Sequence, residues 1–214
     1  MPRFQAVLFD FDGTLADSYA AITASVNYVL DHFTRPQLRE SQVRSLVGHG
    51  LEQLMETILP DIDPKLSARF YRDHHPTVMG PLTKLLPGVA EGLIRLNDQG
   101  IRMGICSNKP TFFTRKLVDQ LGITPYFGVI YGPDSAGSPK PDPAMLTKAI
   151  HHLNAHSSDS LYVGDMVVDI ETGRAAGVET WVMPTGSNDL TTLKASGADR
   201  VFGDMNEVIE AILG

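Results

Sequence analysis

Two carboxylates stand two residues apart near the N-terminus, directly after a short apolar run. The run is Ala6–Phe9, and the carboxylates are Asp10 and Asp12. An unpaired charge inside a buried strand is very costly, whereas polar groups at the carboxyl end of a strand in an open α/β sheet lie where ligands bind. Gly13 after Asp12 also forms a common turn dipeptide. This stretch alone therefore leaves two readings open, a polar turn and a reactive pair.

Three further polar motifs follow predicted strands later in the chain. They are Ser107 with Asn108, Lys140, and Asp165 with Asp169. The carboxyl ends of parallel strands meet along one edge of a sheet, so we expect all of these groups in one pocket with the first pair. Each motif has an ordinary alternative as a helix cap, a first-turn charge or an exposed lysine. Four such motifs in succession are hard to explain by surface solvation.

Carboxylates gathered in one pocket repel one another and require a cation. Oxygen ligands with room for water suit Mg²⁺. Asp169 lies four residues after Asp165, so on a helix both would face the same side. Lys140 stands between two prolines, which restrict the loop and make a held lysine a suitable point charge for a highly anionic transition state.

The elements that position these motifs alternate between strand and helix. Buried strands are predicted at Ala6–Phe9, Ile101–Cys106, Phe127–Tyr131, Ser160–Val163, Glu179–Val182 and Ala198–Phe202. Helical patterns of 10 to 15 residues separate most of them, which predicts an α/β fold with a doubly wound parallel sheet. The exception is residues 16–82, where four helical patterns follow one another without a strand. We interpret residues 16–82 as an inserted helical cap domain, and residues 1–15 with 83–214 as the α/β core domain.

Composition limits the classes of function. The chain has 214 residues, a net charge of −7 and 43% hydrophobic residues. The acidic balance, without a Lys/Arg cluster, argues against nucleic acid as a partner. The single cysteine, Cys106, excludes an intrachain disulfide, and neither a signal peptide nor a membrane span is recognised. We expect a cytoplasmic protein, and the sequence leaves open whether it is a monomer or a homodimer.

Two residues are candidates for substrate selection. His49 lies in the turn Gly48-His49-Gly50 between cap helices, and we expect this turn to cover the site and exclude water on closure. A plain turn with an exposed histidine is the alternative. Lys109 is adjacent to Ser107 and Asn108, and it is a candidate to face a substrate carboxylate.

The motifs, in this order, resemble those of the haloacid dehalogenase-like (HAD) hydrolase superfamily, and within it the phosphoglycolate phosphatase-like branch. The resemblance extends from Phe4 to about Gly177. It implies a Rossmann-like core with a cap, and Mg²⁺ held by the side chains of Asp10 and Asp165 and the backbone carbonyl of Asp12. Asp169 would act on the metal indirectly, through the residues that hold it or through a bound water.

The resemblance also implies roles in a reaction. Asp10 would attack phosphorus and form an aspartyl-phosphate, and Asp12 would serve as acid and then base. Ser107 and Asn108 would bind the phosphoryl group, together with Lys140. An acid at Asp12 fits phosphate ester hydrolysis better than dehalogenation.

We therefore expect a Mg²⁺-dependent phosphomonoesterase for a small phosphorylated metabolite, with 2-phosphoglycolate favoured. A sugar phosphate, a nucleotide or pyrophosphate are alternative substrates. A phosphoryl-transfer mutase and a non-catalytic phosphate-binding protein are alternative functions on the same fold.

Overall fold

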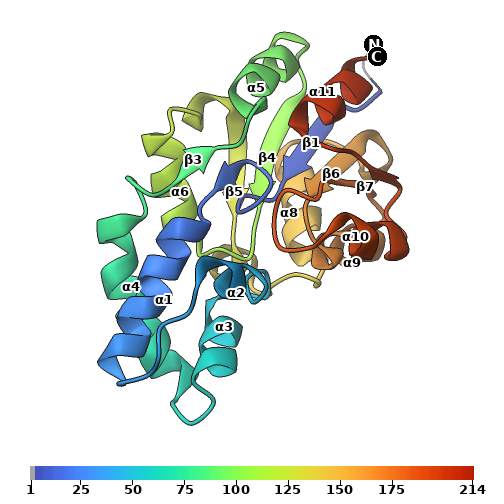
Figure 1. The fold of residues 1–214 in the computed structure, drawn as a ribbon. Coiled ribbons are helices and arrows are strands. Elements are labelled where there is room, and N and C mark those ends of the chain that lie inside the picture. The colour runs from blue at the N-terminus through green and yellow to red at the C-terminus, as the bar shows by residue number, and fades with distance from the viewer. Residues whose placement is uncertain (1–2) are drawn as a thin grey trace.

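The computed structural model describes residues 3–214, and its core is one six-stranded sheet. All neighbouring strands run parallel, in the order β5-β4-β1-β6-β7-β8 (Figure 1). The strands are β1 (Ala6–Phe9), β4 (Arg102–Cys106), β5 (Phe127–Tyr131), β6 (Ser160–Gly164), β7 (Glu179–Val182) and β8 (Arg200–Val201). The predicted doubly wound parallel sheet is therefore confirmed.

Strand β1 lies inside the sheet because its sequence is apolar on both faces. All four of its residues are fully buried, as expected for a strand covered by helices on both sides. Phe9 pairs with Ile105 of β4 on one side and with Val163 of β6 on the other. The residue that follows β1 is thereby fixed between the ends of its two neighbours.

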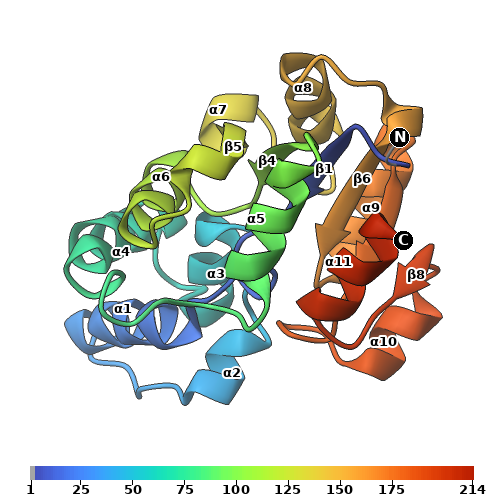
Figure 2. The same ribbon diagram turned by 90° about the horizontal axis from the view of Figure 1, so that it is seen from above.

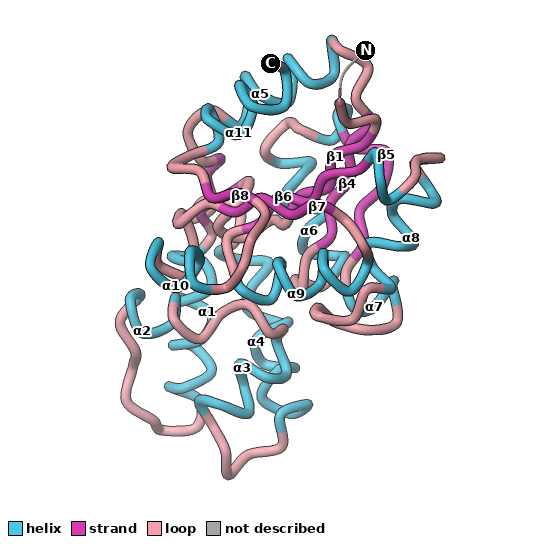
Figure 3. The backbone as a smooth tube through the Cα atoms, turned by 90° about the vertical axis from the view of Figure 1, so that its right-hand side faces the viewer, coloured by secondary structure: helices cyan, strands magenta, loops and turns pink. Residues whose placement is uncertain are grey.

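Helices cover both faces of the sheet (Figures 2 and 3). Val7 and Phe9 belong to the apolar cluster shared with α5 and α11, whereas Ala6 and Leu8 belong to the cluster shared with α8. This division follows from the alternation of side chains along a strand. The core helices are α5 (Val89–Asp98), α6 (Thr111–Gln120), α7 (Pro133–Ala136), α8 (Ala144–His152), α9 (Val167–Ala176), α10 (Leu190–Ala195) and α11 (Met205–Leu213), with short 3-10 turns at Thr124–Tyr126 and Ser157–Asp159.

Four of the five helices between β1 and β4 form a group at one end of the sheet (Figure 3). They are α1 (Tyr19–His32), α2 (Glu40–Arg44), α3 (Leu51–Ile58) and α4 (Pro64–Val78). The two segments that connect this group to the rest of the chain pair with each other as a two-stranded antiparallel ribbon. Its strands are β2 (Ala16–Asp17) and β3 (Lys84–Leu85). We propose that residues 16–82 form a cap domain on a core made of residues 1–15 and 83–214, of which residues 1 and 2 lie outside the described part.

The local pattern misplaced some boundaries. A proline inside a helical pattern usually ends or kinks the helix, but α4 continues past Pro76 to Val78. Proline removes only its own N–H donor, and the Met79 N–H still donates to the His75 carbonyl at 2.9 Å. The ribbon, α7 and α10 were not predicted, because two to six residues are too few to display a period. Within residues 3–214, no helix combines the length and apolar character needed to cross a membrane.

Candidate active site

The polar motifs meet at the carboxyl ends of the three central strands. Asp10, Ser107 and Asp165 are the first residues after β1, β4 and β6. Since β1 pairs with both β4 and β6, these three side chains lie next to one another at one edge of the sheet. All three are buried. The sheet therefore gathers residues that are far apart in sequence, as the strand pattern predicted.

Three carboxylates form a compact acidic cluster at this edge. One oxygen from each of Asp10, Asp165 and Asp169 lies within 4.8 Å of the others. Burial raises the pKa of Asp10 to about 6, with Lys140 acting in the opposite direction and Asp169 adding to the rise. Burial, with the charges of Asp169 and Asp10, also raises the pKa of Asp165 well above its usual range. The surroundings of the cluster therefore favour the protonated forms of Asp10 and Asp165 over the ionised forms.

The acidic cluster fits a divalent cation. The Oδ1 atom of Asp10 is buried and has no hydrogen-bond partner among residues 3–214. A buried carboxylate oxygen without a donor is destabilising unless a cation or water satisfies it. Hard oxygen donors of this kind suit Mg²⁺. Asp10 and Asp165 are therefore fitting ligands, with the Asp12 backbone carbonyl as the third ligand that the family resemblance implies.

Asp169 forms a buried ion pair with Lys140 within the acidic cluster. The Lys140 ammonium lies 2.7 Å from Asp169 Oδ1 and 3.1 Å from Asp10 Oδ2. Burial lowers the pKa of Lys140, but the charges of Asp10 and Asp169 outweigh burial and leave it raised. The other Asp169 oxygen accepts hydrogen bonds from the backbone N–H groups of Asp165 and Met166. Asp169 thus orients the charged lysine and the loop that carries Asp165.

Several supporting residues were not predicted from the sequence. The Tyr162 hydroxyl accepts a hydrogen bond from Lys140 at 3.1 Å and lies 2.8 Å from Asp169 Oδ1. Thr14 Oγ1 and the Ser187 N–H both donate to Asp165, at 2.9 and 3.1 Å. The one available signal was Tyr162 itself, because a phenol in a buried strand requires a hydrogen-bond partner.

Gly13 allows the first motif to approach Asp165. Its φ is +87°, a conformation that side chains rarely adopt, and an added Cβ would lie 2.7 Å from Asp165 Oδ2. The Gly13 carbonyl accepts a hydrogen bond from Thr185 Oγ1 at 2.6 Å. The turn after Asp12 therefore requires glycine, and it joins the first motif to the loop that follows β7.

Asp12 lies in a different environment from Asp10. Its carboxylate accepts a hydrogen bond from the Ser18 hydroxyl. Lys109 Nζ donates to both carboxylate oxygens, at 3.1 Å to Oδ1 and 3.2 Å to Oδ2. The side chain of Lys109 is only 4% exposed. The two carboxylates of the motif are thus paired with different lysines, Asp10 with Lys140 and Asp12 with Lys109.

Asn108 connects the core to the cap. Its Oδ1 accepts a hydrogen bond from the Lys140 N–H at 2.7 Å, and its Nδ2 donates to the Gly48 carbonyl at 2.9 Å. The side-chain amide is therefore engaged with protein groups on both sides. Phosphate binding by Asn108 stays a prediction, and Ser107 remains the predicted side-chain donor to a phosphoryl oxygen.

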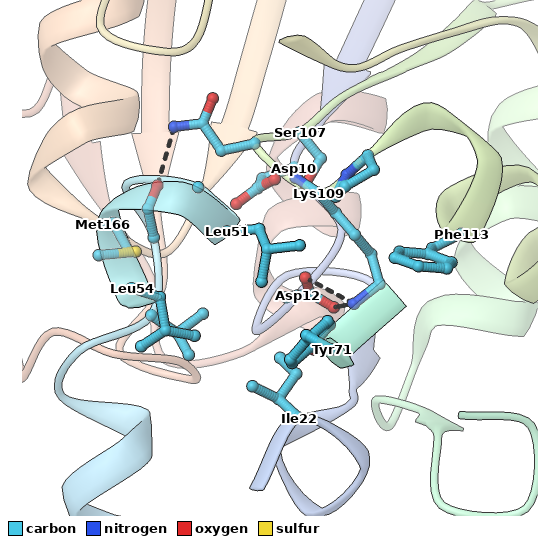
Figure 4. Close-up of a pocket in the computed structure, with 15 residues that line it drawn as sticks. Asp10, Asp12, Ile22, Leu51, Leu54, Tyr71, Ser107, Lys109, Phe113 and Met166 are labelled. Carbon is cyan, nitrogen blue, oxygen red and sulfur yellow. Dashed lines mark hydrogen bonds and ion pairs between the residues drawn. The ribbon is translucent and has the colours of Figure 1, made fainter. Parts of the chain in front are cut away.

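A cavity between core and cap opens onto Asp10 and Asp12 (Figure 4). It offers about 60 Å³ to water-sized molecules. Its lining comprises Asp10, Asp12, Ile22, Val47, Gly48, Gly50, Leu51, Leu54, Tyr71, Ser107, Asn108, Lys109, Pro110, Phe113 and Met166. His49 is exposed and lines an adjoining outer groove instead, so its role in selecting substrate stays a prediction. Tyr71 of α4 was not singled out in the sequence.

Comparison with known proteins agrees with this geometry. A family model described as haloacid dehalogenase-like hydrolase matches residues 7–183. The phosphoglycolate phosphatase of Nitrosococcus oceani is 30% identical over 212 residues, which cover 95% of this chain and 94% of that protein. Phosphoglycolate phosphatase 1 of Pseudomonas aeruginosa is 33% identical, covering 98% of this chain and 79% of that protein. The crystal structure of a predicted phosphoglycolate phosphatase from Haemophilus somnus has a TM-score of 0.88 at 26% identity, covering 99% of both chains.

The parallel sheet, the carboxylates at its edge and the family match define the class of this protein. The chain belongs to the haloacid dehalogenase-like hydrolases. Within that family it is a HAD-type phosphatase, similar over nearly its whole length to proteins named phosphoglycolate phosphatase.

Proposed function

We propose that this protein is a Mg²⁺-dependent phosphomonoesterase that hydrolyses a small phosphorylated metabolite, with 2-phosphoglycolate as the favoured substrate. The observation that carries the proposal is the buried Asp10 carboxylate, with one unpartnered oxygen, in an acidic cluster that faces a small cavity. A bound Mg²⁺ would supply positive charge to the cluster and to the phosphoryl oxygens. The names of the similar proteins support phosphoglycolate as the substrate.

The first half of the proposed reaction transfers the phosphoryl group to Asp10. An Asp10 oxygen attacks phosphorus, and the bond between phosphorus and the leaving oxygen breaks. Asp12 donates a proton to that oxygen, so that a neutral alcohol leaves. Lys140 and the Ser107 hydroxyl stabilise the charge on the phosphoryl oxygens. The product of this step is an aspartyl-phosphate on Asp10.

The second half regenerates the enzyme. Asp12, now ionised, takes a proton from a water molecule, and that water attacks phosphorus. The bond between phosphorus and the Asp10 oxygen breaks, and inorganic phosphate leaves. Dividing one difficult displacement into two easier ones is the advantage of a covalent intermediate. The apolar lining of the cavity favours the reaction by excluding bulk water while the cap is closed.

The size of the cavity supports a small leaving group. A cavity of about 60 Å³ is small beside a nucleoside, and a larger leaving group would have to extend into the adjoining outer groove. The side chains on the cap side are largely apolar, and they offer few partners for the hydroxyl groups of a sugar. Nucleotides and sugar phosphates would leave polar groups unpaired in this cavity.

The test is phosphate release from a panel of esters with and without Mg²⁺. The panel contains 2-phosphoglycolate, sugar phosphates, nucleotides, pyrophosphate and an aryl phosphate. We expect release that requires Mg²⁺, peaks on 2-phosphoglycolate and is lost in Asp10→Asn. Acid quenching followed by peptide mass spectrometry should find one phosphoryl group on the peptide that contains Asp10. An isomerised product without free phosphate would instead indicate a mutase, and binding without any product would indicate a phosphate-binding protein.

A further inference from the structure

The cavity has two polar groups that the proposed reaction does not use. Apart from the reacting carboxylates, Ser107 and the engaged Asn108, its lining is largely apolar. The exceptions among the described lining residues are the ammonium of Lys109 from the core and the hydroxyl of Tyr71 from the cap. Both residues are buried, with 7% and 5% of their surfaces exposed. Buried polar groups facing a cavity of this kind usually fix the orientation of a ligand.

Lys109 retains capacity for a second anion. An ammonium has three N–H donors, and the only protein group that Lys109 Nζ contacts within residues 3–214 is the Asp12 carboxylate. Lys140, the other buried lysine of the site, is already shared between Asp10 and Asp169. Lys109 is therefore the cation available to the leaving group.

The Tyr71 ring is buried, and no hydrogen bond of its hydroxyl is found among residues 3–214. Its ring stacks on His75 with centroids 4.8 Å apart, and His75 in turn contacts the ring of Phe113 at 5.0 Å. His75 Nδ1 lies 2.9 Å from Ser25 Oγ, which holds the imidazole in place. Burial, together with the charge of Lys109, lowers the pKa of His75 to about 2. His75 is therefore a neutral support and adds no second positive charge to the wall.

The Tyr71 hydroxyl stays a donor. Burial and the charge of Asp12 raise the pKa of Tyr71 well above its usual range, so the phenol keeps its proton. Asp12, Lys109 and Tyr71 all line the same cavity, and Figure 4 draws Tyr71 next to Asp12 and Lys109 in that view. A charged donor from the core and a neutral donor from the cap thus face the same small space.

Resting on the proposed phosphatase function, we infer that Lys109 and Tyr71 form a subsite for a carboxylate on the leaving group. The substrate class is then a phosphorylated short-chain hydroxy acid. A carboxylate accepts hydrogen bonds from both groups, whereas a neutral alkyl end leaves the Tyr71 hydroxyl unpaired and Lys109 with Asp12 as its one anionic partner among residues 3–214. The loss of such buried hydrogen bonds is a strong basis for rejecting an analogue. Because Tyr71 belongs to the cap, the subsite is complete only when the cap is closed.

The test compares 2-phosphoglycolate with ethyl phosphate, which has the same two-carbon length but no carboxylate. We expect Tyr71→Phe to lower the ratio of their kcat/KM values by about tenfold or more, since a hydrogen bond to a charged group is lost. Lys109→Met should lower the ratio further, and Lys109→Arg should restore part of it. The matched controls are Tyr28→Phe and Lys65→Met on exposed parts of the cap, and neither should change the ratio.

A binding measurement separates this inference from the proposed function. Calorimetric titration of 2-phosphoglycolate and of ethyl phosphate into the Asp10→Asn variant, with Mg²⁺, reports affinity without turnover. In one outcome the wild type hydrolyses none of the esters, while Asp10→Asn binds 2-phosphoglycolate more tightly than ethyl phosphate and loses this preference when Tyr71→Phe is added. In that case the proposed activity is wrong and the subsite assignment is supported. If Tyr71→Phe and Lys109→Met leave both the kcat/KM ratio and the affinity ratio unchanged, the subsite assignment is wrong.

Discussion

Removing the charge of Asp10 should stabilise the protein when no metal is present. Asp10 is buried beside two other carboxylates, and one of its oxygens has no partner among residues 3–214. Asp10→Asn keeps the shape of the side chain and removes the charge. Lys140 retains Asp169 at 2.7 Å as a partner, so the substitution does not leave a buried lysine unpaired. We therefore expect greater stability together with loss of activity, a trade that is common at functional sites.

The magnitude follows from the pKa of Asp10. Burial raises this pKa from its ordinary value of 3.8 to about 6 in the folded protein, which corresponds to a penalty of about 3 kcal/mol on the ionised form. The folded state holds the proton more tightly than the unfolded state, so the penalty is absent below pH 4, grows between pH 4 and pH 6, and is complete above pH 6. At about 2–4 °C per kcal/mol for a chain of this length, Asp10→Asn should raise Tm by about 6–12 °C at pH 8.

The assay is thermal unfolding of the wild type and of Asp10→Asn in EDTA across pH 4 to 8. The informative quantity is the difference in Tm between the two proteins, because titrating groups far from Asp10 contribute equally to both. Asp73→Asn, at an exposed position of α4, is the matched control and should show no trend with pH. Adding Mg²⁺ should raise the Tm of the wild type more than that of Asp10→Asn, since the metal stabilises the state to which it binds. A Tm difference that is flat with pH, or negative at pH 8, would refute the reasoning.

Three further outcomes are expected. Asp169→Asn removes one partner of a buried ion pair, which costs about 3–5 kcal/mol of stability. The Tm should therefore fall by roughly 6–20 °C. An unchanged Tm in thermal unfolding would contradict the role of Asp169 in holding Lys140. Asp165→Ala should reduce the rise in Tm produced by Mg²⁺, measured as a titration, and an undiminished rise would exclude Asp165 as a ligand. Gly48→Ala places a Cβ 2.2 Å from the Met166 side chain at a φ of +134°, so kcat/KM should fall about tenfold or more through strain in the closed cap. The control is Gly100→Ala, which is also at positive φ but has no atom near its added Cβ. It should lower Tm without changing KM. Equal effects of Gly48→Ala and Gly100→Ala on KM would contradict the interpretation that strain in the cap is responsible.

The fold was predictable because it depends on local patterns. Ala6–Phe9 is apolar at every position, and the structure buries all of it inside the sheet. Polar residues directly after such strands then lie at a common edge, whatever the details of packing. The acidic cluster of Asp10, Asp165 and Asp169 follows from these two facts.

What the sequence could not reveal depends on how the cap helices lie against the core. Tyr71 looked like any apolar position of an amphipathic helix, and only the placement of α4 directs it into the cavity. His49, by contrast, was singled out for its type and position in a glycine turn, but the structure places it on the outer groove. The pairing of Lys109 with Asp12 and the span of Asn108 between Lys140 and Gly48 are tertiary contacts without any local signal.

The central place of β1 has a consequence for synthesis of the chain. The partners of this first strand are Arg102–Cys106 and Ser160–Gly164, so the last of them is made about 150 residues later. At translation rates of about 5–20 residues per second, β1 stays without its second neighbour for about 8–30 s. The cap helices, whose contacts are more local, are complete well before then. The whole cap segment is therefore synthesised while β1 still lacks β6, and the duration of β1's exposure to aggregation and chaperones is determined by strand order.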